Sequence, residues 1–330
     1  MPGTVASIQI MLERNPGVHL VWVSIPGGDH GSYLGGAIGK NCDNCARDAM
    51  SFKFGSATTE EQAKLNTLFP GRFHYITDVP QNINGKPLSS GHKNRNVHRA
   101  SAYYALWYAR HVLKRTWAVK LRSDHLFRKA DFLVWFCALQ QRFPLSQAAR
   151  KNQTARIVVP SAGTTLSQQW GAFHMGDFWT AGHLRDLLAY YDIANPAWDP
   201  SSSSSMGGSP ETELSGYWMR CQHITGNYAK SEAGFRRLLT ERAILVHNRA
   251  LDVLWLKYRT VAQWELATTA CGPLSSFPLI PGTRQLSRGM CVDHDAFGDA
   301  LSSQKQCPEA VGDGSGVLNC TNNGTLSTQK

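Results

Sequence analysis

The sequence lacks any long apolar run. No stretch of the 330-residue chain approaches the roughly 18 uninterrupted apolar residues that a membrane-spanning helix needs. Its most apolar segment, residues 243–256, is interrupted by His247, Arg249 and Asp252, and we expect an amphipathic core helix there. Residues 1–9 show no basic stretch followed by an apolar one, so we expect no cleavable signal peptide. These absences favour a cytoplasmic chain or a fragment of a longer protein.

Cysteine is also scarce for a disulfide-stapled scaffold, with eight residues in the whole chain. The pair Cys42 and Cys45 has no second CxxC or HxxxH at zinc-finger spacing, so we expect ordinary thiols there. Four cysteines lie in residues 271–330, together with glycosylation sequons at Asn319 and Asn323. This tail leaves open a Golgi or secretory lumen beside a cytoplasmic or membrane-peripheral location.

Acidic residues are fewer than basic ones, and the difference is unevenly spread. The chain carries a formal charge of +10; residues 271–330 hold four Lys and Arg against five Asp and Glu, which leaves +11 for residues 1–270. Such a basic body suits an anionic partner, either a nucleotide diphosphate, a membrane surface or a nucleic acid. Because no DNA- or RNA-binding motif is present, we expect no nucleic acid and retain the nucleotide and peripheral membrane contact.

Helical and strand-like patterns alternate along the chain. Helical patterns cover residues 4–15, 96–114, 182–191 and 237–259, and strand patterns cover residues 19–25, 72–77, 116–121, 157–160 and 172–175. We therefore expect one α/β domain over residues 1–270, with a mainly parallel central sheet flanked by helices. Residues 271–330 are rich in Gly, Pro and Ser without a sustained period, which predicts a loop-rich tail.

An acidic residue follows the strand predicted at residues 116–121. In open α/β sheets ligands bind outside the carboxyl ends of the strands, so Asp124 is placed to hold a divalent cation that bridges two phosphates. Lys120 and Arg122 would add positive charge for the same phosphates. The alternative is a structural ion pair between Arg122 and Asp124.

Polar and basic residues crowd the start of the helix predicted at residues 96–114. Asn96 and Arg99 lie in this run, and a helix N-terminus offers free N–H groups to a phosphate. The alternative is a solvated helix start with Asn96 as its N-cap.

Two further carboxylates are candidates for a general base toward an acceptor hydroxyl. Asp177 follows the strand predicted at residues 172–175, and Glu211 lies in the first turn of a helix that Ser209 and Pro210 open. Glu211 would equally complement the positive end of that helix dipole, and that alternative stays open.

These motifs resemble a known family. Residues 96–99 (Asn-Val-His-Arg) and residues 120–124 (Lys-Leu-Arg-Ser-Asp) are similar to the Asn-x-x-Arg and Lys-x-Arg-(Thr/Ser)-Asp elements of the WavE lipopolysaccharide-synthesis family. Residues 173–182 and 209–211 resemble later elements of that family in the same order. The resemblance covers about residues 4–260.

The resemblance implies a GT-A-type glycosyltransferase that uses a nucleotide-sugar donor and a saccharide acceptor in surface-polysaccharide synthesis. It implies a divalent cation, Mn²⁺ or Mg²⁺, at Asp124. The diphosphate would lie among four residues, namely Asn96, Arg99, Lys120 and Arg122. Glu211 would be the catalytic base, with Asp177 as its rival.

The chain departs from the family pattern in three places. The strand that normally precedes the first helix has no counterpart before residue 4, residues 201–208 resemble an insertion, and the Cys-containing tail is foreign to the pattern. We therefore keep one alternative, a catalytically inactive glycosyltransferase-like protein that binds glycans.

Overall fold

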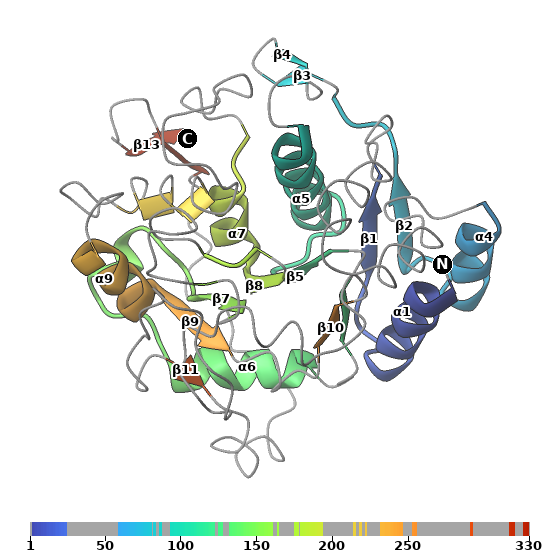
Figure 1. The fold of residues 1–330 in the computed structure, drawn as a ribbon, viewed down its shortest axis with the longest axis horizontal. Helices are drawn as coiled ribbons and strands as arrows, with labels where there is room; N and C mark the ends of the chain where they lie inside the picture. Colours follow the sequence, from blue (N-terminus) through green and yellow to red (C-terminus); the bar gives the residue numbers. More distant parts are fainter. Residues whose placement is uncertain are drawn as a thin grey trace, which may run out of the picture.

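The fold is described from a computed structural model of the chain, drawn in Figure 1. The described residues are 2–24, 59–80, 82–83, 86–87, 93–122, 125–127, 132–160, 164, 175–177, 179–193, 214–215, 218–219, 222, 232–246, 253–255, 291–292, 317–320 and 326–329.

Helices and strands alternate along the described part of residues 2–255, as the sequence predicted. The helices are α1 (Pro2–Arg14), α4 (Thr59–Leu68), α5 (Lys93–His111), α6 (Phe132–Arg142), η1 (Ala149–Lys151), α7 (Leu184–Tyr190) and α9 (Glu232–Arg242). The strands are β1 (Leu20–Val23), β2 (Phe73–Ile76), β3 (Asn82–Ile83), β4 (Lys86–Pro87), β5 (Trp117–Leu121), β6 (His125–Phe127), β7 (Ile157–Pro160), β8 (Trp179–His183), β9 (Ala243–Val246) and β10 (Val253–Trp255), followed in the tail by β11 (Cys291–Val292), β12 (Val317–Cys320) and β13 (Leu326–Gln329).

The largest sheet has five strands in the order β11-β9-β7-β8-β5. The pairs β11–β9 and β9–β7 are parallel, whereas β8 runs antiparallel to both β7 and β5. The chain is thus α/β, but this sheet is mixed and the expectation of a mainly parallel one was wrong. The cause is β8, which was not predicted: residues 179–181 were assigned to no element and residues 182 and 183 to the following helix, yet all five residues form a buried strand. Strands buried on both faces do not alternate, so periodicity alone does not identify them.

A second misassignment concerns residues 237–259. The predicted long helix ends at Arg242 as α9, and the next four residues form β9, all buried between β7 and β11. Residues 253–255 are then strand β10, antiparallel to β6. The Ala-Ile-Leu-Val run of β9 is typical of a strand that is buried on both faces. From sequence alone, however, such a short apolar run looks the same in a buried strand and in a buried helix.

A separate parallel pair, β1–β2, lies beside α5, with α1 and α4 on its other side (Figure 1). The corner where α1 turns into β1 is held by Arg72, which immediately precedes β2. Its guanidinium donates to the backbone carbonyls of Leu12 at 2.8 Å, Asn15 at 2.8 Å and Val18 at 2.9 Å. One side chain therefore satisfies the end of a helix and fixes the entry into a strand.

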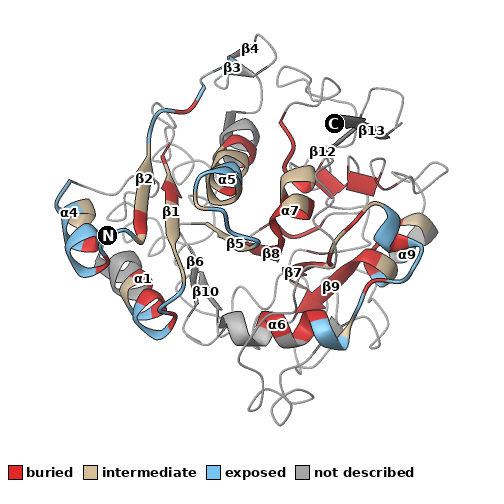
Figure 2. Cartoon of the chain, turned by 180° about the vertical axis from the view of Figure 1, so that it is seen from behind, coloured by how far each residue is buried: buried red, intermediate tan, exposed pale blue. Residues whose placement is uncertain are grey.

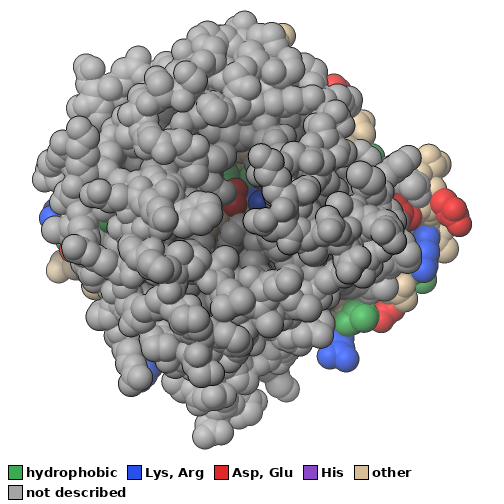
Figure 3. All heavy atoms as spheres, viewed as in Figure 1, with side chains coloured by type: hydrophobic (Ala, Val, Ile, Leu, Met, Phe, Trp, Pro, Cys, Tyr) green, Lys and Arg blue, Asp and Glu red, His purple; other side chains and the backbone are tan. Residues whose placement is uncertain are grey.

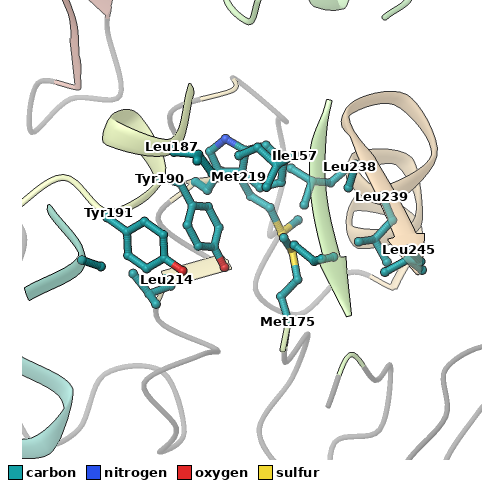
Figure 4. Close-up of a cluster of buried hydrophobic side chains, with 14 of the residues drawn as sticks. Ile157, Met175, Leu187, Tyr190, Tyr191, Leu214, Met219, Leu238, Leu239 and Leu245 are labelled. Atoms are coloured by element: carbon teal, nitrogen blue, oxygen red, sulfur yellow. The ribbon is translucent and has the colours of Figure 1, made fainter. Parts of the chain in front are cut away.

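Two large apolar clusters and a small one around Ala100 hold the described elements together. The first joins α1, α4, β1 and β2 to α6 and the main sheet through residues such as Leu12, Leu65 and Trp179. The second packs α7 and α9 against β7 and β9, and Figure 4 shows its side chains gathered around Ile157 and Tyr190. The buried colour of β7, β8 and β9 in Figure 2 marks this central layer.

Two further observations bear on the sequence predictions. Cys137 on α6 is buried and disulfide-bonded, a bridge that the sequence did not predict. Within the described part of the chain, every helix is too short or too polar to cross a bilayer.

Candidate functional site

The strand pair β5–β8 sets the geometry of the candidate site. Lys120 is paired with Thr180 and Leu121 with Trp179, and the two strands run in opposite directions. The residues just after β5 therefore lie beside those just before β8. This register brings Arg122 to Asp177 although 55 residues separate them in sequence.

Asp177 is a buried carboxylate beside a partly exposed guanidinium. Its Oδ1 lies 4.0 Å from Nη1 of Arg122, and the side chains are 3% and 18% exposed respectively. Residues 175–177 are not a strand, and residues 172–174 of the strand predicted there lie outside the described residues. Asp177 thus lies two residues before β8 begins.

Lys120 is tied to the same segment. Its ammonium donates to the backbone carbonyl of Asp177 and lies 5.6 Å from the ring centroid of Tyr191, a cation–π contact. The Tyr191 hydroxyl is 3.1 Å from Oγ1 of Thr180, which is the β8 residue paired with Lys120. The hydrogen bond to Asp177 and the cation–π contact with Tyr191 hold the half-buried Lys120 side chain at the edge strand of the sheet.

Arg99 also contacts the turn that follows α7. Its side chain, only 3% exposed, donates from Nη2 to the backbone carbonyl of Asp192. Burial, and then the nearby Asp192 carboxylate, raise the pKa of Tyr103 on the next turn of α5. The structure therefore brings Arg99 and Lys120 to adjacent residues, Asp192 and Tyr191.

The helix start differs from the prediction. Because α5 begins at Lys93, Asn96 is a residue of its first turn and not its N-cap. The side chain of Asn96, and the whole of Asp124 and Glu211, lie outside the described residues. Among the residues whose positions are described, no group of three or more His, Cys, Asp or Glu is arranged to hold a metal ion.

Figure 3 draws all heavy atoms of the chain, and near the middle of this view acidic, basic and apolar side-chain atoms of described residues are visible close to one another.

Three residues of this arrangement were missed by the sequence analysis, namely Thr180, Tyr191 and Asp192. Thr180 belongs to β8, which was not predicted, and Tyr191 and Asp192 lie in the turn after α7, at the end of the helix predicted over residues 182–191. The signal that would have identified them is the pairing of β5 with β8. This pairing places Thr180 opposite Lys120, and it becomes apparent only when β8 is recognised as a strand.

Comparison of the chain with known protein families, with curated proteins and with solved structures gave no match in any of the three searches.

Proposed function

We propose that this chain is a GT-A-type glycosyltransferase that transfers a sugar from a nucleotide-sugar donor to a saccharide acceptor, as its resemblance to the WavE family implies. The surface-polysaccharide or secretory-glycan setting belongs to the same proposal. The observation that best supports it is Arg122, a partly exposed guanidinium held beside a buried carboxylate at the end of β5.

Arg122 is suited to bind a diphosphate. A guanidinium donates two parallel hydrogen bonds to phosphate oxygens, and it does so best when its rotamer is already fixed. Asp177 supplies that constraint from 4.0 Å, while part of the Arg122 side chain stays open to solvent. Lys120 and Arg99 would add positive electrostatic potential for the same diphosphate. Both side chains are held in place by hydrogen bonds to backbone carbonyls, Lys120 to that of Asp177 and Arg99 to that of Asp192.

The remaining roles follow from chemistry. Asp124, two residues beyond Arg122, would hold a divalent cation, Mn²⁺ or Mg²⁺, which neutralises charge on the departing nucleoside diphosphate. The first turn of α5, with Asn96, would present backbone N–H groups to a phosphate. A carboxylate that is 3% exposed and beside a cation is a poor base for an acceptor hydroxyl. We therefore assign Asp177 to positioning Arg122 and Glu211 to the base.

A thermal-shift screen of UDP-, GDP- and CMP-sugars, with and without Mn²⁺, tests the proposal. One nucleotide at about 100 times its Kd should stabilise the chain by about 2.7 kcal/mol. The variant Arg122→Gln should lose most of that stabilisation, whereas Arg142→Gln, exposed at the end of α6, should keep it.

The variant Asp124→Asn should keep the fold but lose the Mn²⁺-dependent part of the shift, because a neutral amide loses the charge that a hard cation requires. Equal stabilisation of Asp124→Asn and wild type would reduce Asp124 to a structural role. Stabilisation by a free oligosaccharide, and by none of the nucleotides, would instead identify an inactive glycan-binding protein.

A further inference from the structure

Almost all of the net charge comes from one stretch of the chain. Between residues 79 and 123 there is no Asp or Glu, and the stretch holds nine Lys and Arg residues: Lys86, Lys93, Arg95, Arg99, Arg110, Lys114, Arg115, Lys120 and Arg122. The rest of the chain has 25 basic and 24 acidic residues, a difference of +1 against +10 overall. Because α5 lies within this stretch, basic residues occur in the sequence near both of its ends.

The two ends of α5 use that charge differently. Near its start, Arg99 is buried against Asp192, inside the candidate site. At its other end, roughly 18 Å further along at 1.5 Å per residue, the cations lie on or near the surface. His111 and Lys114 are exposed there, and Arg110 is half-buried.

Exposed apolar side chains lie among these cations. Trp107 is 43% exposed and Val112 is 48% exposed, two of the four large hydrophobic residues most open to solvent among the described ones. The ring of Trp107 is 5.2 Å from that of His111. We define the α5-end patch as Trp107, Arg110, His111, Val112 and Lys114.

The positive charges of the patch act on His111. The pKa of His111 is lowered by burial, and then by the nearby charges of Arg110 and Lys114. Since neighbouring cations oppose protonation of the imidazole, the local potential is positive. An anionic surface that docked here would relieve this repulsion.

We propose that the α5-end patch docks the protein peripherally on an anionic lipid bilayer. Cations at a membrane surface are attracted to anionic headgroups. Tryptophan prefers the headgroup level, where its ring is half in contact with lipid, and an exposed valine gains by entering the acyl boundary. A nucleic acid would satisfy the cations but would leave Val112 without a gain, so the combination favours lipid.

Sedimentation of the full chain with lipid vesicles tests this proposal at low salt. Vesicles of phosphatidylcholine with about one-third phosphatidylserine should bind the chain, and vesicles of phosphatidylcholine alone should bind it far less. Each basic residue at such a surface contributes about fivefold to partitioning. Lys114→Glu changes the charge by two and should weaken binding about 25-fold, while Trp107→Ala should weaken it severalfold.

The helix α4 offers matched controls on a different surface. Lys64 is exposed and Leu68 is 42% exposed four residues later, but Glu60 and Glu61 precede them in the same helix. Figures 1 and 2 both show β1 and β2 between α4 and α5. Lys64→Glu and Leu68→Ala should bind vesicles nearly as well as wild type, with melting temperatures confirming that all four variants fold.

Three outcomes would overturn the proposal. The first is equal binding of wild type to neutral and anionic vesicles. The second is equal loss of binding in Lys64→Glu and Lys114→Glu, which would show that only net charge matters. The third is tighter binding to duplex DNA with the same dependence on Lys114, which would replace the membrane with a nucleic acid.

Discussion

At the scale of single residues, Asp186 links the folding free energy to pH. Its carboxylate is buried and accepts hydrogen bonds from the backbone N–H groups of Thr154 and Ala155 at 2.8 to 3.1 Å. Burial nevertheless dominates and raises its pKa from 3.8 to about 7. In the unfolded chain Asp186 releases its proton near pH 4, whereas the folded chain holds it up to about pH 7. This group's contribution to stability therefore falls as pH rises from about 4 to 7.

The variant Asp186→Asn should remove this pH dependence. Denaturant unfolding at several pH values gives the difference in unfolding free energy between wild type and variant. This difference should change by at most about 1.4 kcal/mol per pH unit, the effect of one titrating proton. Taking the difference removes the contributions of all other titrating groups, because they are the same in both proteins. A flat difference between pH 4 and pH 7 would show that Asp186 is ionised in the folded chain.

His19 and His74 form a second titrating pair, with the opposite sign. A guanidinium only donates, so Nε2 of His19 accepts from Arg115; Nδ1 of neutral His19 then carries the proton that faces Nε2 of His74 at 3.1 Å. The pKa of each histidine is lowered, first by burial and then by the charge of Arg115. The stability from this pair is present above about pH 6.5 and is lost as pH falls below it.

We therefore expect Arg115→Gln to raise the pKa of both histidines. Histidine ring-proton NMR shifts across a pH titration measure this directly. Lys151→Gln, an exposed change before β7, serves as the control and should move neither titration. If Arg115→Gln shifts His19 but not His74, the charge of Arg115 acts only on its hydrogen-bonded neighbour.

The residues of the candidate site were predictable only in part. Position near the end of a strand or near a helix start was enough to select Arg99, Lys120 and Arg122 as candidates, because those positions follow from local pattern. The partners of Lys120 were not predictable, since Thr180 and Tyr191 approach it through a strand pairing. Local patterns do not encode which distant strand lies alongside.

At the scale of elements, the end of α5 contains one unfavourable backbone conformation. Lys114 has φ of 52°, a left-handed geometry that costs an L-residue roughly 1 kcal/mol and glycine nothing. After it, the N–H of Arg115 donates to the carbonyl of Ala109 at 2.9 Å. The left-handed residue thus turns the chain from α5 into β5.

Lys114→Gly should stabilise the fold by up to about 1 kcal/mol. The gain is reduced because glycine raises the conformational entropy of the unfolded chain. Thermal denaturation measures this, with Lys151→Gly as a control that should destabilise or do nothing. The same Lys114→Gly variant should bind anionic vesicles less well, because it also removes a charge of the α5-end patch. A drop in stability would place Lys114 outside the left-handed region in solution.

Most of the described elements were predicted well. The helices α1, α5 and α7 and the strands β1, β2, β5 and β7 all lie within a few residues of their expected bounds. The failures, β8 and β9, are strands in which every residue is buried, and so is β7, which its β-branched run Ile-Val-Val identified. Unlike β7, β8 and β9 directly adjoin a helix in the sequence, and because they show no alternation, only tertiary pairing decides where helix ends and strand begins.

At the scale of the whole molecule, the tail contributes little to the described sheet. Two of its residues, Cys291 and Val292, pair with β9 at one edge, and β12 and β13 pair only with each other. We expect a chain ending at residue 270 to fold and to retain nucleotide binding, with a lowered melting temperature from the lost edge strand. Circular dichroism and the nucleotide screen check this. Insolubility under both reducing and oxidising conditions would make the tail part of the core.

The Arg72 corner has a consequence for how the chain is made. The carbonyls that Arg72 caps lie 54 to 60 residues earlier in the sequence, at the end of α1 and the start of β1. During synthesis these groups emerge from the ribosome first and stay bonded to water until residue 72 follows. The carbonyl end of α1 therefore gains these hydrogen bonds only after residue 72 has been made. Ribosome-bound chains cut by protease should show a cleavable α1 before residue 72 has emerged and a protected one afterwards.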